Sequence, residues 1–112
     1  MAVSTIPNYN FAQTPVDAHQ VTFTNIGNIY IYRIGRIAFM QMEKTVLYNL
    51  VSGTKVMDLP DAVKPYSQFR ATIRSSSGSS YGLVFNTSGS VLVDSAITAN
   101  TLVGMDIVWL TA

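Results

Sequence analysis

Side chains able to do acid–base or metal chemistry are few and scattered in this chain of 112 residues. His19 is the only histidine, and the sequence offers no partner that would orient it as a general base. Asp58 and Asp61 flank a Leu-Pro pair and could converge as paired carboxylates or as calcium ligands. Calcium takes about 6 to 8 oxygen ligands, and no alternation of Asp and Asn surrounds this pair. The sequence therefore predicts no catalytic residue, no metal site and no cofactor, and favours a binding protein over an enzyme.

Residues suited to binding are better represented than residues suited to catalysis. The chain has six Tyr, five Phe and one Trp. A Tyr or Trp ring offers an apolar face for stacking and a polar tip for hydrogen bonding, which suits protein interfaces and the faces of sugars. We predict a saccharide site made of exposed aromatic residues and their hydrogen-bonding neighbours, with His19 as a weaker member: Tyr48, Tyr66, Gln68, Arg70, Tyr81 and His19.

The arginines are a second source of binding chemistry. A guanidinium presents a planar fork to a carboxylate or phosphate, although an arginine on a strand more commonly faces solvent. The chain has four of them: Arg33, Arg36, Arg70 and Arg74.

Charge is scarce, and this excludes several classes of protein. Only 12% of the residues are Asp, Glu, Lys or Arg, against about 25% in a typical soluble domain. A net charge of +1 without a basic run lacks the electrostatic footprint of nucleic-acid binding. No uncharged apolar run reaches the roughly 18 residues of a membrane span, so we expect no membrane insertion. We expect no secretion signal either, and the absence of cysteine is typical of a protein made in a reducing cytosol.

The elements that must position these side chains are predicted to be strands. Val, Ile and Thr make up 32 of the 112 residues, and apolar residues recur with a period of two. Residues 1–20 are rich in Pro, Asn and Gln, and we predict an irregular lead-in or linker stump there. Residues 21–112 are predicted to form one antiparallel β-barrel or sandwich of seven to eight strands. The expected strands are 21–24, 29–33, 37–43, 54–57, 67–74, 81–85, 91–93 and 102–110.

Two groups of apolar residues are predicted to lie in the core or at an oligomer interface. Tyr30 and Tyr32 alternate with Ile29 and Ile31, so both faces of that strand are apolar or aromatic. One face is expected to meet another subunit or a ligand, unless the two rings fill a core edge with their hydroxyls at the rim. The second group shares one face of the last strand and is expected in the core or at a subunit interface: Met105, Ile107 and Trp109.

The order of these segments resembles a known family. Tyr32-Arg-Ile-Gly-Arg-Ile-Ala38, an alternating strand, Leu50-Val-Ser-Gly-Thr-Lys-Val-Met-Asp-Leu-Pro60 and Lys64-Pro65 follow one another. This order, and the strands and glycine turns after it, is similar to the C-terminal head domains of tailed-phage receptor-binding and tail-fibre proteins. The resemblance covers about residues 20 to 112.

The resemblance implies a compact antiparallel β-barrel or sandwich that forms a homotrimer and binds host cell-surface saccharide without catalysis. Its other partners would be tail or baseplate proteins, and it would be located at the tail tip or baseplate of a virion assembled in the host cytoplasm. Two alternatives remain open at this point. One is a structural baseplate or virion scaffold protein, and the other is a carbohydrate-binding module of a polysaccharide-degrading enzyme.

Overall fold

The computed structural model describes residues 16–112, and these form a single sheet of eight antiparallel strands. This confirms the predicted all-β fold and strand number. The only helical element in this range is the short 3-10 turn η1 (Asp61–Val63). The strands are β2 (Asp17–Phe23), β3 (Gly27–Ile34), β4 (Ile37–Thr45), β5 (Lys55–Asp58), β6 (Phe69–Ser75), β7 (Ser80–Phe85), β8 (Ser90–Val93) and β9 (Leu102–Leu110).

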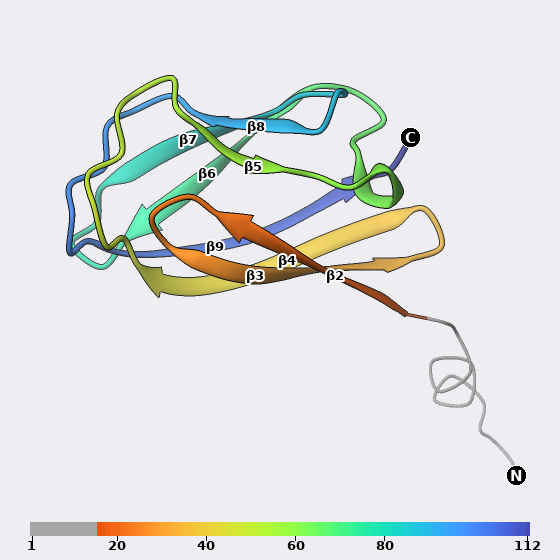
Figure 1. The fold of residues 1–112 in the computed structure, drawn as a ribbon, viewed down its shortest axis with the longest axis horizontal. Coiled ribbons are helices and arrows are strands. Elements are labelled where there is room, and N and C mark those ends of the chain that lie inside the picture. Colours follow the sequence, from red (N-terminus) through yellow and green to blue (C-terminus); the bar gives the residue numbers. More distant parts are fainter. Residues whose placement is uncertain (1–15) are drawn as a thin grey trace, which may run out of the picture.

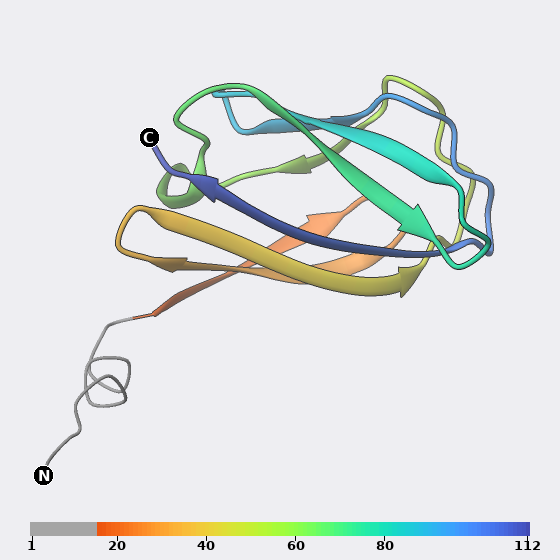
Figure 2. The same cartoon turned by 180° about the vertical axis from the view of Figure 1, so that it is seen from behind.

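The sheet curls into a nearly closed barrel. Its strand order is β2-β3-β4-β9-β6-β7-β8-β5. Figures 1 and 2 show β2, β3 and β4 with β9 in one layer and β5 to β8 in the other. The two edge strands meet where the Thr24 amide, just after β2, donates a 2.8 Å hydrogen bond to the Val56 carbonyl of β5. This contact covers part of the free strand edge that an open sheet would expose.

The shortest hydrogen-bonded ladder between neighbouring strands of the sheet joins β6 and β9. These strands are paired at Arg74↔Gly104 and Ser75↔Val103, whereas β9 pairs with β4 over its whole length. Beyond this short ladder, the next backbone contact is the Tyr66 amide bonded to the Leu110 carbonyl at 2.8 Å. The outer surface between β6 and β9 therefore changes from a continuous sheet into a splayed one along the barrel.

The core follows the predicted alternation. Met105, Ile107 and Trp109 point inward and are at most 6% exposed, so within this chain they are core residues. The Trp109 ring lies 5.2 Å from the ring of Phe85 and 6.0 Å from that of Phe69, measured between centroids. Its indole Nε1 donates a 2.9 Å hydrogen bond to the Val63 carbonyl. This bond satisfies the indole N–H and the Val63 carbonyl, and it joins β9 to the turn η1.

The predicted boundary of the lead-in was wrong by several residues. β2 begins at Asp17, and Asp17↔Arg33 through Phe23↔Gly27 are paired with β3. The segment before Val21 has few β-branched residues, so its own sequence does not indicate a strand. Pairing with the long neighbour β3 imposes extended structure on it, as tertiary context often does. The remainder of the predicted lead-in, residues 1–15, lies outside the described residues.

His19 therefore lies in strand β2 and not in an irregular lead-in. It pairs with Ile31 and is partly buried. Its Nε2 is buried and has no hydrogen-bond partner among the residues that the structure describes. No carboxylate or amide orients the ring, so nothing in the described chain equips it as a general base.

Candidate functional site

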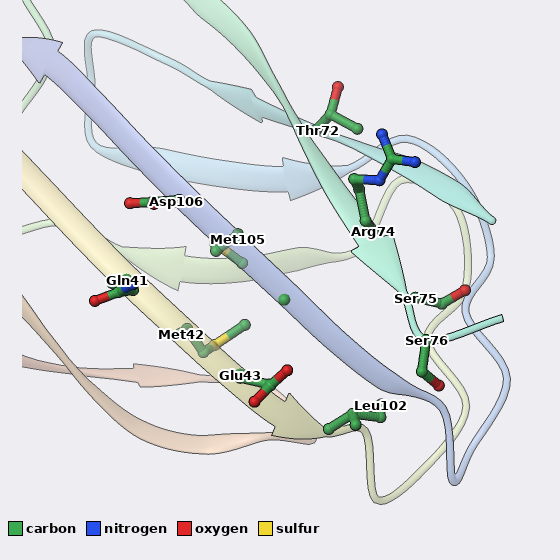
Figure 3. Close-up of a pocket in the computed structure, with 11 residues that line it drawn as sticks. Gln41, Met42, Glu43, Thr72, Arg74, Ser75, Ser76, Leu102, Met105 and Asp106 are labelled. Carbon is green, nitrogen blue, oxygen red and sulfur yellow. The ribbon is translucent and has the colours of Figure 1, made fainter. Parts of the chain in front are cut away.

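A groove of about 810 Å³ lies on the outer side of β4, β9 and β6 (Figure 3). It lies at the end of the barrel where β6 and β9 are still paired. Most of its outward side chains are polar or charged. The groove is lined by Gln41, Met42, Glu43, Thr72, Arg74, Ser75, Ser76, Leu102, Gly104, Met105 and Asp106.

A glycine forms the middle of the groove floor. Glu43 on β4 is the register partner of Gly104 on β9, and Gly104 is the partner of Arg74 on β6. Adjacent strands are about 4.8 Å apart, so the Cα atoms of Glu43 and Arg74 are about 10 Å apart across the glycine. A Cβ atom at Gly104 would have the Met42 carbonyl at 3.6 Å as its one neighbour within 4 Å. The space above this glycine is therefore open.

The groove carries charged side chains that form no ion pair with any other residue in the range 16–112. The ion pairs within residues 16–112 are Lys55–Asp58, Lys64–Asp61 and Arg70–Asp94. None of them includes Glu43, Arg74 or Asp106, all of which line the groove and are exposed. Two carboxylates and one guanidinium thus line one groove, and no ion pair within the described residues engages them.

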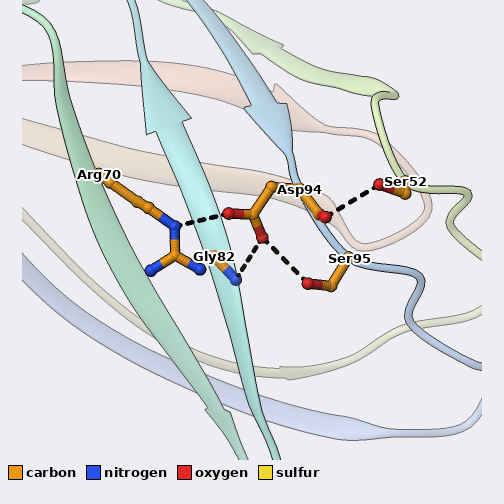
Figure 4. A network of polar contacts seen from close by, with 5 residues as sticks. All are labelled: Ser52, Arg70, Gly82, Asp94 and Ser95. Atoms are coloured by element: carbon orange, nitrogen blue, oxygen red, sulfur yellow. Dashed lines mark hydrogen bonds and ion pairs between the residues drawn. The ribbon is translucent and has the colours of Figure 1, made fainter.

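Arg70, on the same outer face as Arg74, is in the opposite situation (Figure 4). Its Nε donates a 2.5 Å hydrogen bond to Asp94 Oδ2. Asp94 Oδ1 accepts 3.0 Å bonds from the Gly82 amide and from Ser95 Oγ. The hydrogen bond from Arg70 is the main reason that the pKa of Asp94 lies below its ordinary value, and the pKa of Arg70 is raised in turn. The fork of Arg70, a predicted ligand group, is therefore already engaged by a carboxylate of the protein.

The other half of the same outer surface is apolar. Tyr32 on β3, Phe39 on β4 and Val108 on β9 form one cross-strand row. The Tyr32 ring stacks on Phe39 at a centroid distance of 5.5 Å and on Tyr30 at 6.3 Å. Val108 is 65% exposed and Tyr30 is 50% exposed. We call this surface the apolar face and define it by Tyr30, Tyr32, Ile34, Ile37, Phe39, Val108 and Leu110.

The predicted saccharide residues do not come together in one place. Tyr48 follows β4 in the chain and is exposed, whereas exposed Tyr66 is bonded to Leu110 at the far end of β9. Because β4 and β9 are antiparallel, these two rings lie at opposite ends of the barrel. Tyr81 points inward and packs partly against the core. Gln68 is exposed just before β6.

The paired-carboxylate alternative is not formed. Asp58 binds Lys55 with a 3.0 Å ion pair, and Asp61 binds Lys64 with one of 2.7 Å. The pKa of Asp61 is lowered, chiefly by its hydrogen bond from Lys64. Within residues 16–112, no three His, Cys, Asp or Glu side chains are grouped closely enough to hold a metal ion. No helix in the same range is long and apolar enough to cross a membrane.

Most groove residues were missed by the sequence analysis, apart from Arg74, which was noted as an arginine able to bind an anion. The alternation of the last strand does place Gly104 and Asp106 opposite the core residues Met105 and Ile107. What the sequence did not show is that β9 lies between β4 and β6. That order brings Glu43 and Arg74, 31 positions apart, to the two sides of one glycine.

Comparison with protein-family models finds no match, and comparison with curated proteins finds no significant match. The geometry of the groove and of the apolar face is therefore the main support for a function.

Proposed function

We propose that this chain is a non-enzymatic receptor-binding head domain of a tailed phage, which binds bacterial cell-surface saccharide as a homotrimer. The observation that carries the binding function is the open, glycine-floored groove between Glu43 and Arg74. The phage assignment is supported by the resemblance of the segment order to tail-fibre heads. The all-β barrel has the fold that this resemblance implies.

The groove suits a ligand rich in hydroxyl groups. A sugar needs convergent hydrogen-bond donors and acceptors more than it needs a deep apolar cavity. The groove offers donors and acceptors on a rigid sheet. Gln41, Thr72 and Ser76 supply neutral donors and acceptors, while the charged side chains form stronger hydrogen bonds. Placement on three adjacent strands fixes these groups better than loops would.

The apolar face supports assembly from copies of this chain. It carries no charged side chain, and four of its members are between 44% and 65% exposed: Tyr30 at 50%, Ile37 at 44%, Val108 at 65% and Leu110 at 44%. Interfaces between obligate subunits are more apolar than ordinary surface. Contact with a second copy would bury this face, and three linked copies raise apparent saccharide affinity by about 10²-fold or more.

The test is binding of the intact protein to purified bacterial cell walls and to a glycan array. We expect the oligomer to be retained on cell-wall polysaccharide and released by an excess of the free saccharide. Absence of binding to every glycan and every cell wall tested, by an oligomeric sample, would contradict the saccharide function.

The runner-up is a structural baseplate or virion scaffold protein. The apolar face is the observation that favours it, because that face is equally suited to another virion protein. Binding to purified virions lacking this chain, without binding to cell walls, would select this alternative.

A further inference from the structure

We propose that the groove selects a zwitterionic saccharide unit, with an amino group held by Glu43 and Asp106 and an acidic group held by Arg74. This inference rests on the proposed saccharide function and names the class of ligand that the same site takes. Neutral sugars would then be weaker ligands than sugars that carry both charges.

The first support is the geometry of the row Glu43–Gly104–Arg74. The two charged residues are register partners of the same glycine, on opposite sides of it. Across two inter-strand spacings their Cα atoms lie about 10 Å apart, and the open space over Gly104 separates them. They form no ion pair with each other, so a ligand lying over the glycine has Glu43 on one side and Arg74 on the other.

The second support is Asp106, which lies on β9 two residues along the strand from Gly104. It is the register partner of Gln41, two residues from the Glu43–Gly104 pair, and it lines the same groove. Figure 3 shows Gln41, Glu43 and Asp106 along β4 and β9, with Arg74 and Thr72 on the neighbouring strand β6. Two carboxylates beside an amide suit an ammonium group, which donates three hydrogen bonds.

The third support is the cost of covering these groups with a neutral ligand. A charged side chain that loses water without gaining a partner is destabilised. The engaged pair Arg70–Asp94, on the same sheet, shows that the fold can neutralise a charge internally. Glu43, Arg74 and Asp106 have no such partner among the residues that the structure describes, so complementary charges on the ligand are the groups that best compensate for desolvation.

The experiment uses two pairs of tetrasaccharides, one pair without and one pair with carboxylates, and within each pair only the amine is changed. They are N-acetylated chitotetraose, which is neutral; chitotetraose, which carries amines; a hyaluronan tetrasaccharide, which carries carboxylates; and its N-deacetylated form, which carries both. Their affinities for the intact protein are measured by isothermal titration calorimetry at about pH 6, where a sugar amine is largely protonated. We expect the zwitterionic sugar to bind about 10-fold more tightly than the neutral one, with a gain that shrinks in added salt.

Single-charge variants assign each contribution. Glu43→Gln should reduce the gain from the amine and leave the gain from the carboxylate, whereas Arg74→Gln should do the reverse. Lys55→Gln and Asp58→Asn are matched controls, because each removes one exposed charge outside the groove. We expect both controls to leave the order of the four affinities unchanged.

The outcomes separate this inference from the proposed function. Equal binding of the neutral and zwitterionic sugars overturns the charge selection and leaves saccharide binding in place. Failure of all four sugars, with cell walls still bound, also overturns the inference alone. Failure of all four together with cell walls overturns both.

Discussion

The outer surface of β4 and β9 has two halves of opposite character, built from the same pair of strands. Toward the start of β4 and the end of β9, Ile37, Phe39, Val108 and Leu110 make the surface apolar. Toward the end of β4 and the start of β9, the outward residues line the polar groove; these are Gln41, Glu43, Gly104 and Asp106. The inner sides of both halves are uniformly buried and apolar.

This difference separates the inward residues, whose apolar type is required by folding, from the outward residues, whose type is not. Alternation dictates that every second residue of β4 and β9 is apolar, because it faces the core. The outward residues are free of that requirement, so an apolar half and a charged half on one ladder need another explanation. We attribute the apolar half to contact between copies and the charged half to ligand binding.

A charge placed in the apolar half should have the strongest consequence, which is loss of assembly. In the homotrimer that we propose, Val108→Glu should separate the copies into monomers of 12.2 kDa, because a carboxylate buried at an apolar interface loses its hydration. The barrel should remain folded, since Val108 is 65% exposed in the single chain. Sedimentation velocity and circular dichroism measure both properties. Thr87→Glu, in the turn between β7 and β8, is the matched control and should sediment like the wild type.

A larger side chain on the groove floor should weaken saccharide binding rather than assembly. Gly104→Val places a branched side chain in the open space between Glu43 and Arg74, where no atom obstructs a Cβ within 3.4 Å. Valine suits a strand better than glycine, so we expect thermal stability to be unchanged or higher. Binding to cell-wall saccharide should fall by about 10-fold or more, because a ligand can no longer reach the floor. A variant that binds normally would place the saccharide elsewhere on the protein.

Particular residues show how far sequence reasoning reached. The alternation over 102–110 predicted the last strand with the bounds that the structure has, and the inward positions of Ile107 and Trp109 follow from the same alternation. The groove was not predictable in this way, because its row joins positions 43, 74 and 104 through the order of strands. The predicted saccharide residues were chosen for side-chain type, and type alone does not tell that Tyr48 and Tyr66 lie at opposite ends.

A substitution in the core beneath both halves should lower the stability of the barrel without acting on one half alone. Trp109→Phe keeps an aromatic ring against Phe85 but leaves the Val63 carbonyl without its donor. An unsatisfied buried carbonyl costs about 1–3 kcal/mol, so the free energy of unfolding should fall by about that amount in denaturant titrations. Oligomerisation and saccharide binding should both persist at 25 °C. Selective loss of either one would show that Trp109 supports one half alone.

The smallest effect is expected from the charge pair that the protein neutralises itself. The lowered pKa of Asp94 stabilises the fold above its ordinary pKa of about 3.9 and ceases to do so as pH falls through the lowered value. Asp94→Asn should therefore lower the melting temperature slightly at pH 7 and flatten its decline between about pH 5 and pH 2. Melting curves across this range measure the effect, and identical pH profiles for the two proteins would contradict it.

The assignment of saccharide binding to the polar half is tested most directly by photo-crosslinking. A bacterial cell-wall saccharide carrying a diazirine is bound to the intact oligomer and activated, and the labelled peptides are identified by mass spectrometry. The account predicts label in residues 41–43, 72–76 and 102–106, and its loss in Gly104→Val. Label confined to residues 37–39 and 108–110, or to a region outside β4, β6 and β9, would contradict the division of this surface into a binding half and an assembly half.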